Sequence, residues 1–334
     1  MAALPLVSLC LLAAWCMAAP GRPAYAQPVV DSTHVPEFGV MVQASAQAEA
    51  EPALYTNGFG VDRARLAVSG SPIAGISYEL EGDFVDEEIL TDAHVDVQMH
   101  AYWRLRAGQF RPPLSYGEIV SSSATPFVLR ARPVRALGAS RKPGALVTYQ
   151  RADWRVDAGT FNGTRIGTAR TEPDAARRTA EDQLMYLGRV AWLPQWATGR
   201  AALGASVAHD PAGDALQHGP RTRYSANAHV QQGAVGLTIE GLAGTAAAPG
   251  EMEAGAYVTG TYQIASVHTA RLRTDWARYK DSVGGPVAEA ATQVGVGYTY
   301  QPASYLRLEA DATVPVDGRD VQPVVVRTQL QVHF

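Results

Sequence analysis

Residues 92–100 read Asp-Ala-His-Val-Asp-Val-Gln-Met-His, and this stretch decides the fold class. Every even position in it is polar and every odd position is apolar. Successive side chains of a β-strand point to opposite faces of the sheet, so this alternation predicts a strand with one wet and one apolar face. The same alternation recurs along the chain, at 76–84, 103–107, 271–276, 305–311 and 327–334. We therefore expect an all-β protein.

Three features favour a transmembrane antiparallel β-barrel over a soluble sandwich, which also alternates. The segments are about ten residues long, the length that a tilted strand needs to cross a bilayer. Their polar faces carry full charges along the whole strand, as the lining of a wide aqueous interior would. Their apolar faces carry aromatic residues near the segment ends, as interfacial girdles do. These aromatic residues are Tyr78, Trp103, Trp154, Trp192, Trp276, Tyr298 and Tyr300.

The connections between the segments alternate in length, as do the short periplasmic turns and longer outer loops of bacterial barrels. Sixteen strands would leave a water-filled channel, and an even number puts both ends of the chain in the periplasm. The alternation is weakest at 143–151 and 183–193, so fourteen strands is the alternative count. The sixteen predicted segments are 37–47, 59–69, 73–84, 89–100, 101–110, 143–151, 153–162, 183–193, 198–209, 221–232, 233–244, 251–263, 267–278, 288–301, 303–313 and 321–334.

Residues 1–26 have the features of a cleaved secretory signal peptide. An apolar stretch over 4–19 is followed by Ala-Tyr-Ala at 24–26, a small-residue cleavage pattern. We therefore expect export across the inner membrane and a single barrel domain over 27–334. The alternative is a retained membrane anchor, for which the apolar stretch is short.

The composition of the 334 residues excludes several classes of protein. The 28 Lys and Arg against 32 Asp and Glu give a formal net charge of −4, whereas a general nucleic-acid binder needs a strongly basic face. A mean hydropathy of −0.08 argues against a bundle of membrane-spanning helices. Both cysteines, Cys10 and Cys16, lie in the expected signal peptide, so the exported chain would form no disulfide and no thiolate site.

The connection at 111–142 is the most informative part of the chain. It is far longer than ordinary connections, and loops of that length are usually functional. It carries six basic residues against one acid, Glu118, so a constriction formed by this loop would be positively charged if the loop folds into the lumen. The basic residues are Arg111, Arg130, Arg132, Arg135, Arg141 and Lys142.

The polar faces of the predicted strands are nearly balanced in charge. The basic side chains are Arg63, Arg65, Arg104, Arg106, Arg155, Arg189, Arg221, Arg223, Arg271, Arg273, Arg307 and Arg327. The acidic side chains are Glu79, Glu81, Asp83, Asp92, Asp96, Asp157, Glu240, Glu253, Asp275, Glu309 and Asp311. The loop would then decide the selectivity, because arginines in a narrow, low-dielectric passage favour anions and offer a rigid fork to phosphate or carboxylate. The alternative is that these arginines pair with lumen acids or with lipopolysaccharide.

Several motifs carry a family resemblance, which covers roughly 56–165. They are GFGVDRARL (58–66), EGDF (81–84), LTDAHV (90–95), LRAGQFRPPLSYGE (105–118) and TFNG (160–163). In these motifs the chain resembles the phosphate-selective porins, the porin O and P family of Gram-negative outer membranes. The terminal Phe334 also resembles the mark that outer-membrane barrels present to the barrel assembly machinery.

The resemblance implies a sixteen-stranded barrel, a homotrimer embedded in outer-membrane lipid, and a third loop folded inward. It also implies passive uptake of phosphate or related anions through a pore lined by arginine ladders and lysine clusters. Arg63, Arg65, Arg104 and Arg106 fall in the matching region. The lysine clusters are missing, because Lys142 and Lys280 are the only lysines of the sequence.

A barrel hydrolase is the rival from another class. His94, Asp96 and His100 share one strand face, where His94 and Asp96 could orient each other as a base. No serine lies beside them in sequence, since the triple serine at 121–123 is in the long loop, and a triad or a metal site has no further support. We find no cofactor motif, and a plugged active transporter would need a longer chain.

The sequence therefore predicts a passive, non-enzymatic outer-membrane porin for small anions, with phosphate or polyphosphate as candidates. Arginines of the long loop and the lumen would set the selectivity. A general, non-selective diffusion porin is the alternative. Neither function needs a cofactor or a nucleic-acid partner.

Overall fold

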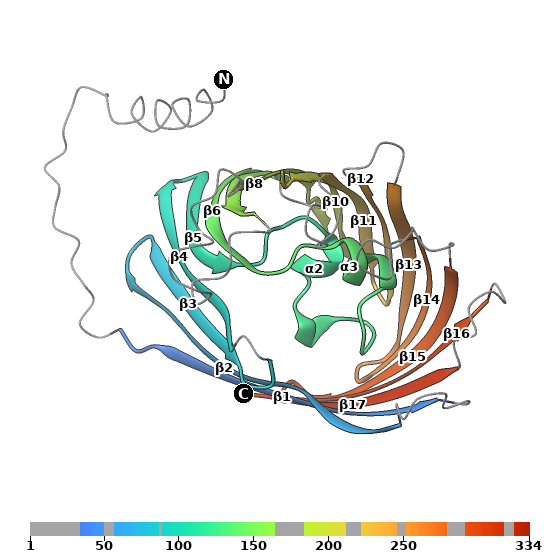
Figure 1. The fold of residues 1–334 in the computed structure, drawn as a ribbon. Coiled ribbons are helices and arrows are strands. Elements are labelled where there is room, and N and C mark those ends of the chain that lie inside the picture. Colours follow the sequence, from blue (N-terminus) through green and yellow to red (C-terminus); the bar gives the residue numbers. More distant parts are fainter. Residues whose placement is uncertain are drawn as a thin grey trace, which may run out of the picture.

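The computed structural model describes residues 34–49, 57–86, 89–163, 184–211, 222–245, 252–278, 291–316 and 324–334. The strands form one sheet that curls into a barrel (Figure 1). They are β1 (Glu37–Glu49), β2 (Gly58–Ile73), β3 (Ile76–Asp83), β4 (Leu90–His100), β5 (Trp103–Phe110), β6 (Lys142–Arg151), β7 (Trp154–Asn162), β8 (Leu184–Trp192), β9 (Gln195–Trp196), β10 (Gly199–His209), β11 (Thr222–Gln232), β12 (Val235–Thr245), β13 (Met252–Ala265), β14 (His268–Arg278), β15 (Ala291–Ala303), β16 (Leu306–Pro315) and β17 (Val325–His333). The expected signal peptide at 1–26 lies outside the described residues. In the described part, no helix is both long enough and apolar enough to cross a membrane.

The barrel closes because its first and last strands pair with each other. Strand β17 runs antiparallel to β1, from Met41 opposite His333 to Glu49 opposite Val325. Strand β8 and the two-residue β9 both pair with β10, so they act as one interrupted strand. The seventeen strands therefore make a ring of sixteen, as the alternation predicts. A closed ring leaves no strand edge whose N–H and C=O groups would face lipid.

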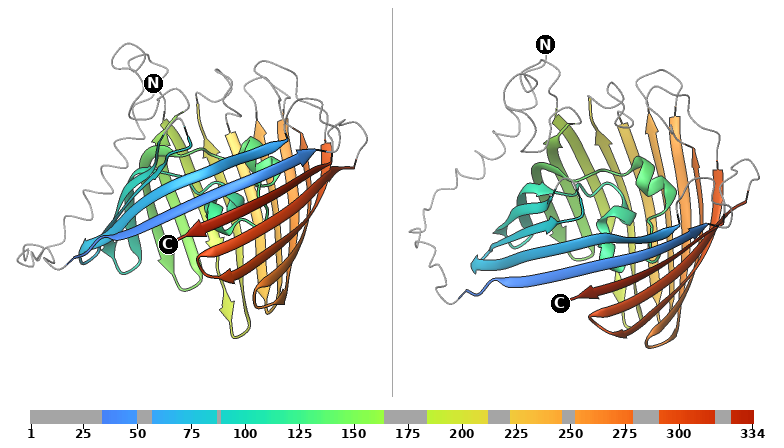
Figure 2. Two further views of the ribbon diagram at one scale, coloured as in Figure 1. Left: turned by 90° about the horizontal axis from the view of Figure 1, so that it is seen from below. Right: turned by 60° about the horizontal axis from the view of Figure 1, so that its bottom comes forward.

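The strands are inclined to the barrel axis, as closure of a sheet into a barrel requires (Figure 2). In these views β1 and β2 are more strongly inclined to the barrel axis than β11 to β14. The register of β1 against β2 shifts between Gln43 and Ala44. Arg63 and Arg65 lie two positions apart in β2, so they share one face of the strand. The long strand β2 thus presents two arginines to the lumen.

Side-chain exposure shows which face of each strand is which. Val95 in the middle of β4 is 43% exposed, whereas its neighbours His94 and Asp96 are 6% and 8% exposed. The apolar side chain therefore points out of the barrel and the polar side chains point in, the reverse of a soluble protein. Large aromatic residues such as Trp103 and Trp154 are also exposed on the outside.

One part of the lumen is apolar, which the strand pattern does not predict. Leu146 of β6 and Met185 and Leu187 of β8 point inward, so these strands carry apolar residues on both faces. This explains why the alternation is weakest at 143–151 and 183–193, and the alternative count of fourteen strands is wrong. The inward residues form one buried cluster, made of Phe110, Leu114, Ala139, Leu146, Phe161, Met185, Leu187 and Ala208.

The chain between β5 and β6, residues 111–141, folds into the barrel as predicted, and we call it the inner loop (Figure 1). It contains the short helices α2 (Tyr116–Ile119), η1 (Ser122–Ala124) and α3 (Arg132–Leu137). Helix α3 begins with a proline in its first turn and packs against β12, β13 and β14. Lys142 already belongs to β6, so it is a residue of the barrel wall and not of the loop.

Candidate functional site

Glu240 of β12 fastens the first helix of the inner loop to the wall. Its Oε1 accepts hydrogen bonds from the Tyr116 backbone N at 2.8 Å and from Ser225 Oγ at 2.7 Å. Its Oε2 accepts from the Gly117 backbone N at 2.9 Å and from the Tyr257 hydroxyl at 2.8 Å. The side chain is 0% exposed, and four donors replace the water that a buried carboxylate loses.

Other charged wall residues hold the rest of the inner loop. Asp311 accepts a hydrogen bond from the Val128 backbone N at 2.8 Å. Three arginines donate to loop carbonyls: Arg223 to Gly138, Arg273 to Leu129, and Arg307 to Ser123 and Thr125. A loop inside a barrel needs such partners, because its backbone groups are removed from bulk water.

These contacts change the role of several residues that the sequence places among the pore-lining charges. Glu240, Asp311, Arg223, Arg273 and Arg307 are anchors of the inner loop. The sequence gives no direct sign of this, because the anchoring depends on where a distant loop comes to rest. The one available signal is general: a long inward loop must find hydrogen-bond partners on the wall.

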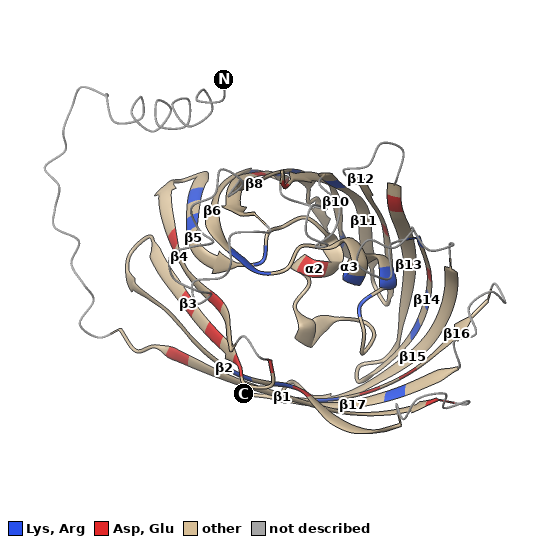
Figure 3. Cartoon of the chain, viewed as in Figure 1, with Lys and Arg blue, Asp and Glu red and all other residues tan. Residues whose placement is uncertain are grey.

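A cavity of about 380 Å³ lies between the inner loop and strands β2 to β7, and we call it the arginine cavity. Its wall side comes from β2 to β7, and its loop side includes Ile119, Val120 and Ser121. The acidic residues on β3 and β4 and the basic residues on β5 and the loop are seen in Figure 3. Four carboxylates line the cavity, those of Glu79, Glu81, Asp92 and Glu118. Eight arginines line it, namely Arg63, Arg65, Arg104, Arg106, Arg111, Arg130, Arg141 and Arg155.

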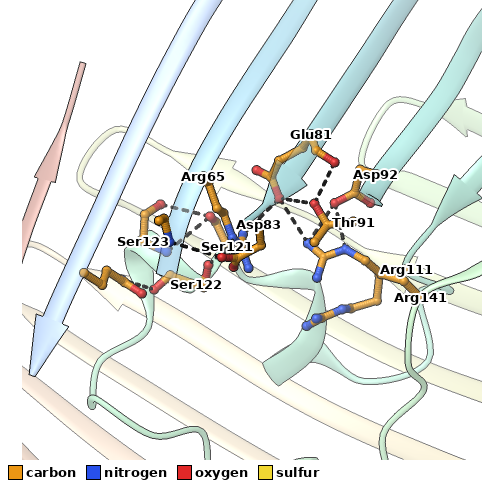
Figure 4. Close-up of polar contacts among 12 residues, drawn as sticks. Arg65, Glu81, Asp83, Thr91, Asp92, Arg111, Ser121, Ser122, Ser123 and Arg141 are labelled. Carbon is orange, nitrogen blue, oxygen red and sulfur yellow. Dashed lines mark hydrogen bonds and ion pairs between the residues drawn. The ribbon is translucent and has the colours of Figure 1, made fainter. Parts of the chain in front are cut away.

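Two arginines of the cavity are held by acids at the level of the inner loop (Figure 4). Arg65 Nε lies 2.8 Å from Asp83 Oδ2, and its Nη1 lies 3.0 Å from Glu81 Oε1. Arg141 reaches from the loop to Asp92 Oδ2 at 2.7 Å and to Glu81 Oε1 at 3.5 Å. Charge on these arginines is largely neutralised by their partners.

Two further arginines contact Asp96 near the turn that joins β4 to β5. Arg106 forms a two-pronged contact with Asp96, at 2.9 and 2.7 Å. Arg104 lies 3.7 Å from the same carboxylate and is 36% exposed in its side chain. Arg104 and Arg106 thus share the Asp96 carboxylate, and Glu79 lies close by, 3.7 Å from His94.

Arg63, Arg111 and Arg130 form no ion pair in the part of the chain that the structure describes. Arg130 donates to the Val120 carbonyl at 2.9 Å, and Arg111 makes only a long contact with the Glu118 carbonyl at 3.5 Å. One buried guanidinium nitrogen of each of the three, Nε of Arg63 and Arg111 and Nη1 of Arg130, has no hydrogen-bond partner. The three side chains therefore present unused donors and full positive charge.

Burial and neighbouring charges change the pKa values of the two loop arginines, Arg111 and Arg130. Burial lowers the pKa of Arg111, although Glu118 acts in the opposite direction. Burial, reinforced by the neighbouring Arg111, lowers the pKa of Arg130 to about 10. Both groups stay protonated at pH 7, so like charges are held together in the cavity.

The structure separates the six basic residues that the sequence assigns to the long loop. Arg111, Arg130 and Arg141 line the arginine cavity together with the predicted Arg63, Arg65, Arg104 and Arg106. Arg132 and Arg135 lie on α3, which packs on β12 to β14, and neither lines the cavity. Lys142 does not line it either. The arginine cavity thus brings together three of the six basic residues, and Arg130 lies apart from Arg132 and Arg135.

The residues of the rival hydrolase do not assemble into a triad. His94 Nε2 lies 3.5 Å from Asp96 Oδ2 and 3.7 Å from Glu79 Oε2, and its Nδ1 has no partner. Asp96 is committed to Arg106, and His100 is exposed at the end of β4. The loop serines contact each other and Arg65, not His94. No metal-binding group of three or more ligands occurs among the described residues.

Phe334 follows the last strand and remains on the outside of the barrel. Its side chain is 76% exposed and stacks on Tyr305, with ring centroids 6.3 Å apart. Its backbone exchanges two hydrogen bonds with Val40 of β1. The terminal aromatic residue is therefore placed at the seam where the barrel closes.

Solved outer-membrane proteins share this fold. A loop-deleted OmpT of Vibrio cholerae superposes with a TM-score of 0.64 at 12% identity, covering 90% of this chain and 99% of that one. Salmonella typhi OmpF gives 0.62 at 8% identity, covering 90% and 97%. Pseudomonas putida OprB gives 0.61 at 10% identity, covering 90% and 94%.

A relative found by sequence similarity matches a smaller share of the chain than the solved structures do. An uncharacterized protein of Caulobacter vibrioides is 27% identical over 167 residues, which is 48% of this chain but 34% of that protein. The matched region thus spans about a third of that relative.

The family model described as phosphate-selective porin O and P matches residues 42–211. This segment holds the strands and the inner loop that enclose the arginine cavity. Because the match spans just over half of the sequence and the remaining strands complete the same ring, the chain belongs to the phosphate-selective porin O and P family of outer-membrane porins, which are channels and not enzymes.

Proposed function

We propose that the protein is a passive channel for small anions, with phosphate and polyphosphate as candidate solutes. The observation that carries this proposal is the group of three arginines without ion pairs, Arg63, Arg111 and Arg130, on one cavity between the inner loop and the wall. The cavity is the constriction of the channel in this proposal. The family name supports phosphate as a solute, whereas the missing lysine clusters favour a wider range of anions.

The physical argument rests on charge in a confined space. A permeating anion loses part of its hydration in a narrow passage, and fixed guanidinium groups replace it with donors and with a favourable potential. Arginine keeps its charge at all relevant pH values and forms two parallel hydrogen bonds with phosphate or carboxylate. Arg104 and Arg106, which share Asp96, add two more guanidinium groups to the lining near the turn between β4 and β5.

A general diffusion porin is the second candidate, and a specific observation favours it. Arg65 and Arg141 are paired with Glu81, Asp83 and Asp92, so part of the positive lining is cancelled. If the three unpaired arginines did not dominate the potential, solutes would be sorted by size alone.

A matched pair of loop variants tests the anion proposal. Arg130→Glu changes the charge of the arginine cavity by two units, whereas Arg135→Glu makes the same change on α3, outside the cavity. We expect Arg130→Glu to lower the chloride-to-potassium permeability ratio by about five- to tenfold and to weaken block of chloride current by phosphate. The ratio is measured from reversal potentials in planar bilayers.

Arg135→Glu should leave the permeability ratio within about twofold of the wild-type value, since its charge lies outside the cavity. Equal effects of the two variants would contradict a filter at the arginine cavity. A wild-type channel that prefers potassium would overturn the anion proposal as a whole.

Three expectations about assembly belong to the same proposal. We infer that residues 1–26 are removed during export, that Phe334 is read by the barrel assembly machinery, and that three barrels associate in the membrane. The exposed position of Phe334 at the closing seam supports its accessibility. One of the similar OmpT structures is described as a trimer form, which supports the oligomeric state.

A further inference from the structure

A pocket of about 50 Å³ lies behind the inner loop, between the loop and strands β12 to β14, and we call it the rear pocket. Thr238 of β12, Thr259 of β13 and Arg273 of β14 line it from the wall. These three residues lie at one level of the sheet, because Thr259 is opposite Thr238 on one side and opposite Arg273 on the other. Arg130 lines the pocket from the loop, and it also lines the arginine cavity. Helix α3 packs on the same strands (Figure 1).

Two buried polar atoms on the rear pocket have no hydrogen-bond partner among the described residues. One is Oγ1 of Thr259, a residue that is 2% exposed, and the other is Nη1 of Arg130. The Arg130 side chain is held in place by its Nη2, which donates to the Val120 carbonyl at 2.9 Å. Buried polar groups of native proteins are nearly always hydrogen-bonded, because leaving one unsatisfied is costly. Two such atoms, one from the loop and one from the wall, point to a ligand that bonds to both.

The charge of the lining favours an anion. Arg130 forms no ion pair in the described part of the chain, and no aspartate or glutamate is among the described residues that line the rear pocket. The Arg273 guanidinium donates to the Leu129 carbonyl at 2.8 Å and lies 3.2 Å from Asp275, which offsets its charge. Arg130 therefore supplies the net positive charge. A guanidinium can only donate hydrogen bonds and a hydroxyl can donate one, so the ligand that suits both is an acceptor with negative charge.

The size and the remaining lining decide which kind of anion fits. A cavity needs about 10–15 Å³ to hold one water molecule, so the rear pocket has room for a single small anion together with water. Much of the lining is apolar, including Val120, Leu129 and Val134, so a bound ion is partly dehydrated. Removing an ion from water costs more when the ion is very small or doubly charged. The pocket therefore suits chloride, bromide or nitrate better than fluoride or divalent phosphate.

We propose that the rear pocket is a binding site for one small monovalent anion, such as chloride, which accepts hydrogen bonds from Arg130 of the loop and Thr259 of the wall. The anion joins the inner loop to β13 and adds to the anchors that Glu240 and Asp311 supply. It stays bound and is not a transported solute, so this site is separate from the proposed filter at the arginine cavity. An anion that binds only the folded protein raises its stability as the anion concentration increases.

Crystals of the full-length exported chain grown in sodium bromide test the site directly. We expect an anomalous bromide signal in the rear pocket, in contact with Nη1 of Arg130 and Oγ1 of Thr259. Water alone at that position, in crystals that contain bromide, would overturn the proposal.

Unfolding in detergent tests the site in solution. The denaturation midpoint is measured over a range of bromide concentrations, with fluoride keeping the ionic strength constant, and we expect the wild-type midpoint to rise as bromide replaces fluoride. Thr259→Val removes the hydroxyl and keeps the shape of the side chain. It should weaken bromide binding about tenfold, through the loss of one hydrogen bond to a charged ligand. Thr261→Val is the matched control, because Thr261 shares the face of β13 with Thr259 and is not among the residues that line the rear pocket.

General salt effects act on the whole protein surface, so they would shift the wild type and both variants alike. An equal response to bromide in the wild type and in Thr259→Val overturns the proposal, and so does a wild-type midpoint that does not rise, a measurement that needs no variant. A bromide signal in the crystal without a rise in solution would mean binding at crystal concentration only and overturns it too. These measurements involve no ion current, so their outcome is independent of the reversal potentials that test the anion channel.

Discussion

An arginine inside this barrel has one of three roles, and its neighbours decide which. Arg65 is neutralised by Glu81 and Asp83, while Arg307 holds loop carbonyls and shares Glu309 with Arg271. Arg130 donates to the Val120 carbonyl but has no acid partner among the described residues, so its positive charge can act on solutes. The same side chain thus serves as wall structure, as loop anchor or as part of the proposed filter.

At the scale of residues, the anchor Glu240 offers a direct test of how the inner loop is held. Replacing Glu240 with Ala leaves the backbone N–H groups of Tyr116 and Gly117 without their acceptor. Hydrogen bonds to a charged acceptor contribute about 1.5–3 kcal/mol each, so we expect the first half of the loop to loosen from the wall. Single-channel recordings should show larger and noisier conductance than the wild type.

Asp62→Ala is the matched control, because it removes an acid of β2 whose side chain hydrogen-bonds Ser45 of β1 and Gln329 of β17. Unchanged conductance and noise in Glu240→Ala would mean that the remaining anchors, such as Asp311 with Val128, hold the loop without it.

At the scale of elements, the inner loop and strands β6 to β10 depend on each other. Phe110 at the end of β5 and Leu114 at the start of the loop lie in one buried cluster with Leu146, Phe161 and Met185 of the wall. These strands are apolar inside because a loop covers them, and the loop is held inside because they are apolar. A second, smaller cluster forms where Val134 and Leu137 of the loop pack on Leu242 of β12 and Tyr257 of β13.

Phe161→Ala tests this mutual packing. The ring of Phe161 is 1% exposed and meets Phe110 edge-on, with centroids 5.2 Å apart. Removing a buried phenylalanine side chain costs about 3–5 kcal/mol, so we expect unfolding in detergent at a clearly lower denaturant concentration. Val156→Ala on the same strand, where Val156 is 43% exposed to the outside, is the control and should change the midpoint far less. Equal losses would show that the inner cluster contributes little.

At the scale of the whole molecule, closure of the ring separates two solvents. Apolar side chains face lipid, and charges are gathered in a lumen whose free space is narrowed by the inner loop. Positive charge held in that space acts over a distance that depends on the salt around it. The proposed anion preference is thus a property of the assembled barrel and not of any single strand.

Salt should therefore weaken the selectivity. The Debye length falls from roughly 10 Å at 0.1 M to roughly 3 Å at 1 M, so the field of the arginine cavity reaches less of the passage. We expect the chloride-to-potassium ratio of the wild type to fall toward the ratio of ion mobilities as the mean salt concentration rises between these values. Reversal potentials at a constant concentration gradient measure it. A ratio that is independent of salt would point to sorting by size.

The ring of strands could be predicted from the order of residues, because a period of two along each segment follows directly from one face in lipid and one in water. Residues 92–100 show this locally, and no distant contact is needed to read them. That the long connection enters the lumen was implied by the family resemblance, whereas its length indicated only that it is functional. The weak alternation at 183–193 marked the place where a second apolar surface is needed, although the sequence does not say what covers it.

Which charges remain unpaired depends on contacts across the barrel. Arg130 and Arg135 lie five positions apart in one loop, yet one lines the arginine cavity and the other lies on a helix against a different wall. Whether Glu240 lines a pore or anchors a loop depends on where residues more than a hundred positions away come to rest. Pairing and burial are properties of contacts across the closed barrel, and the order of residues along the chain does not contain those distances.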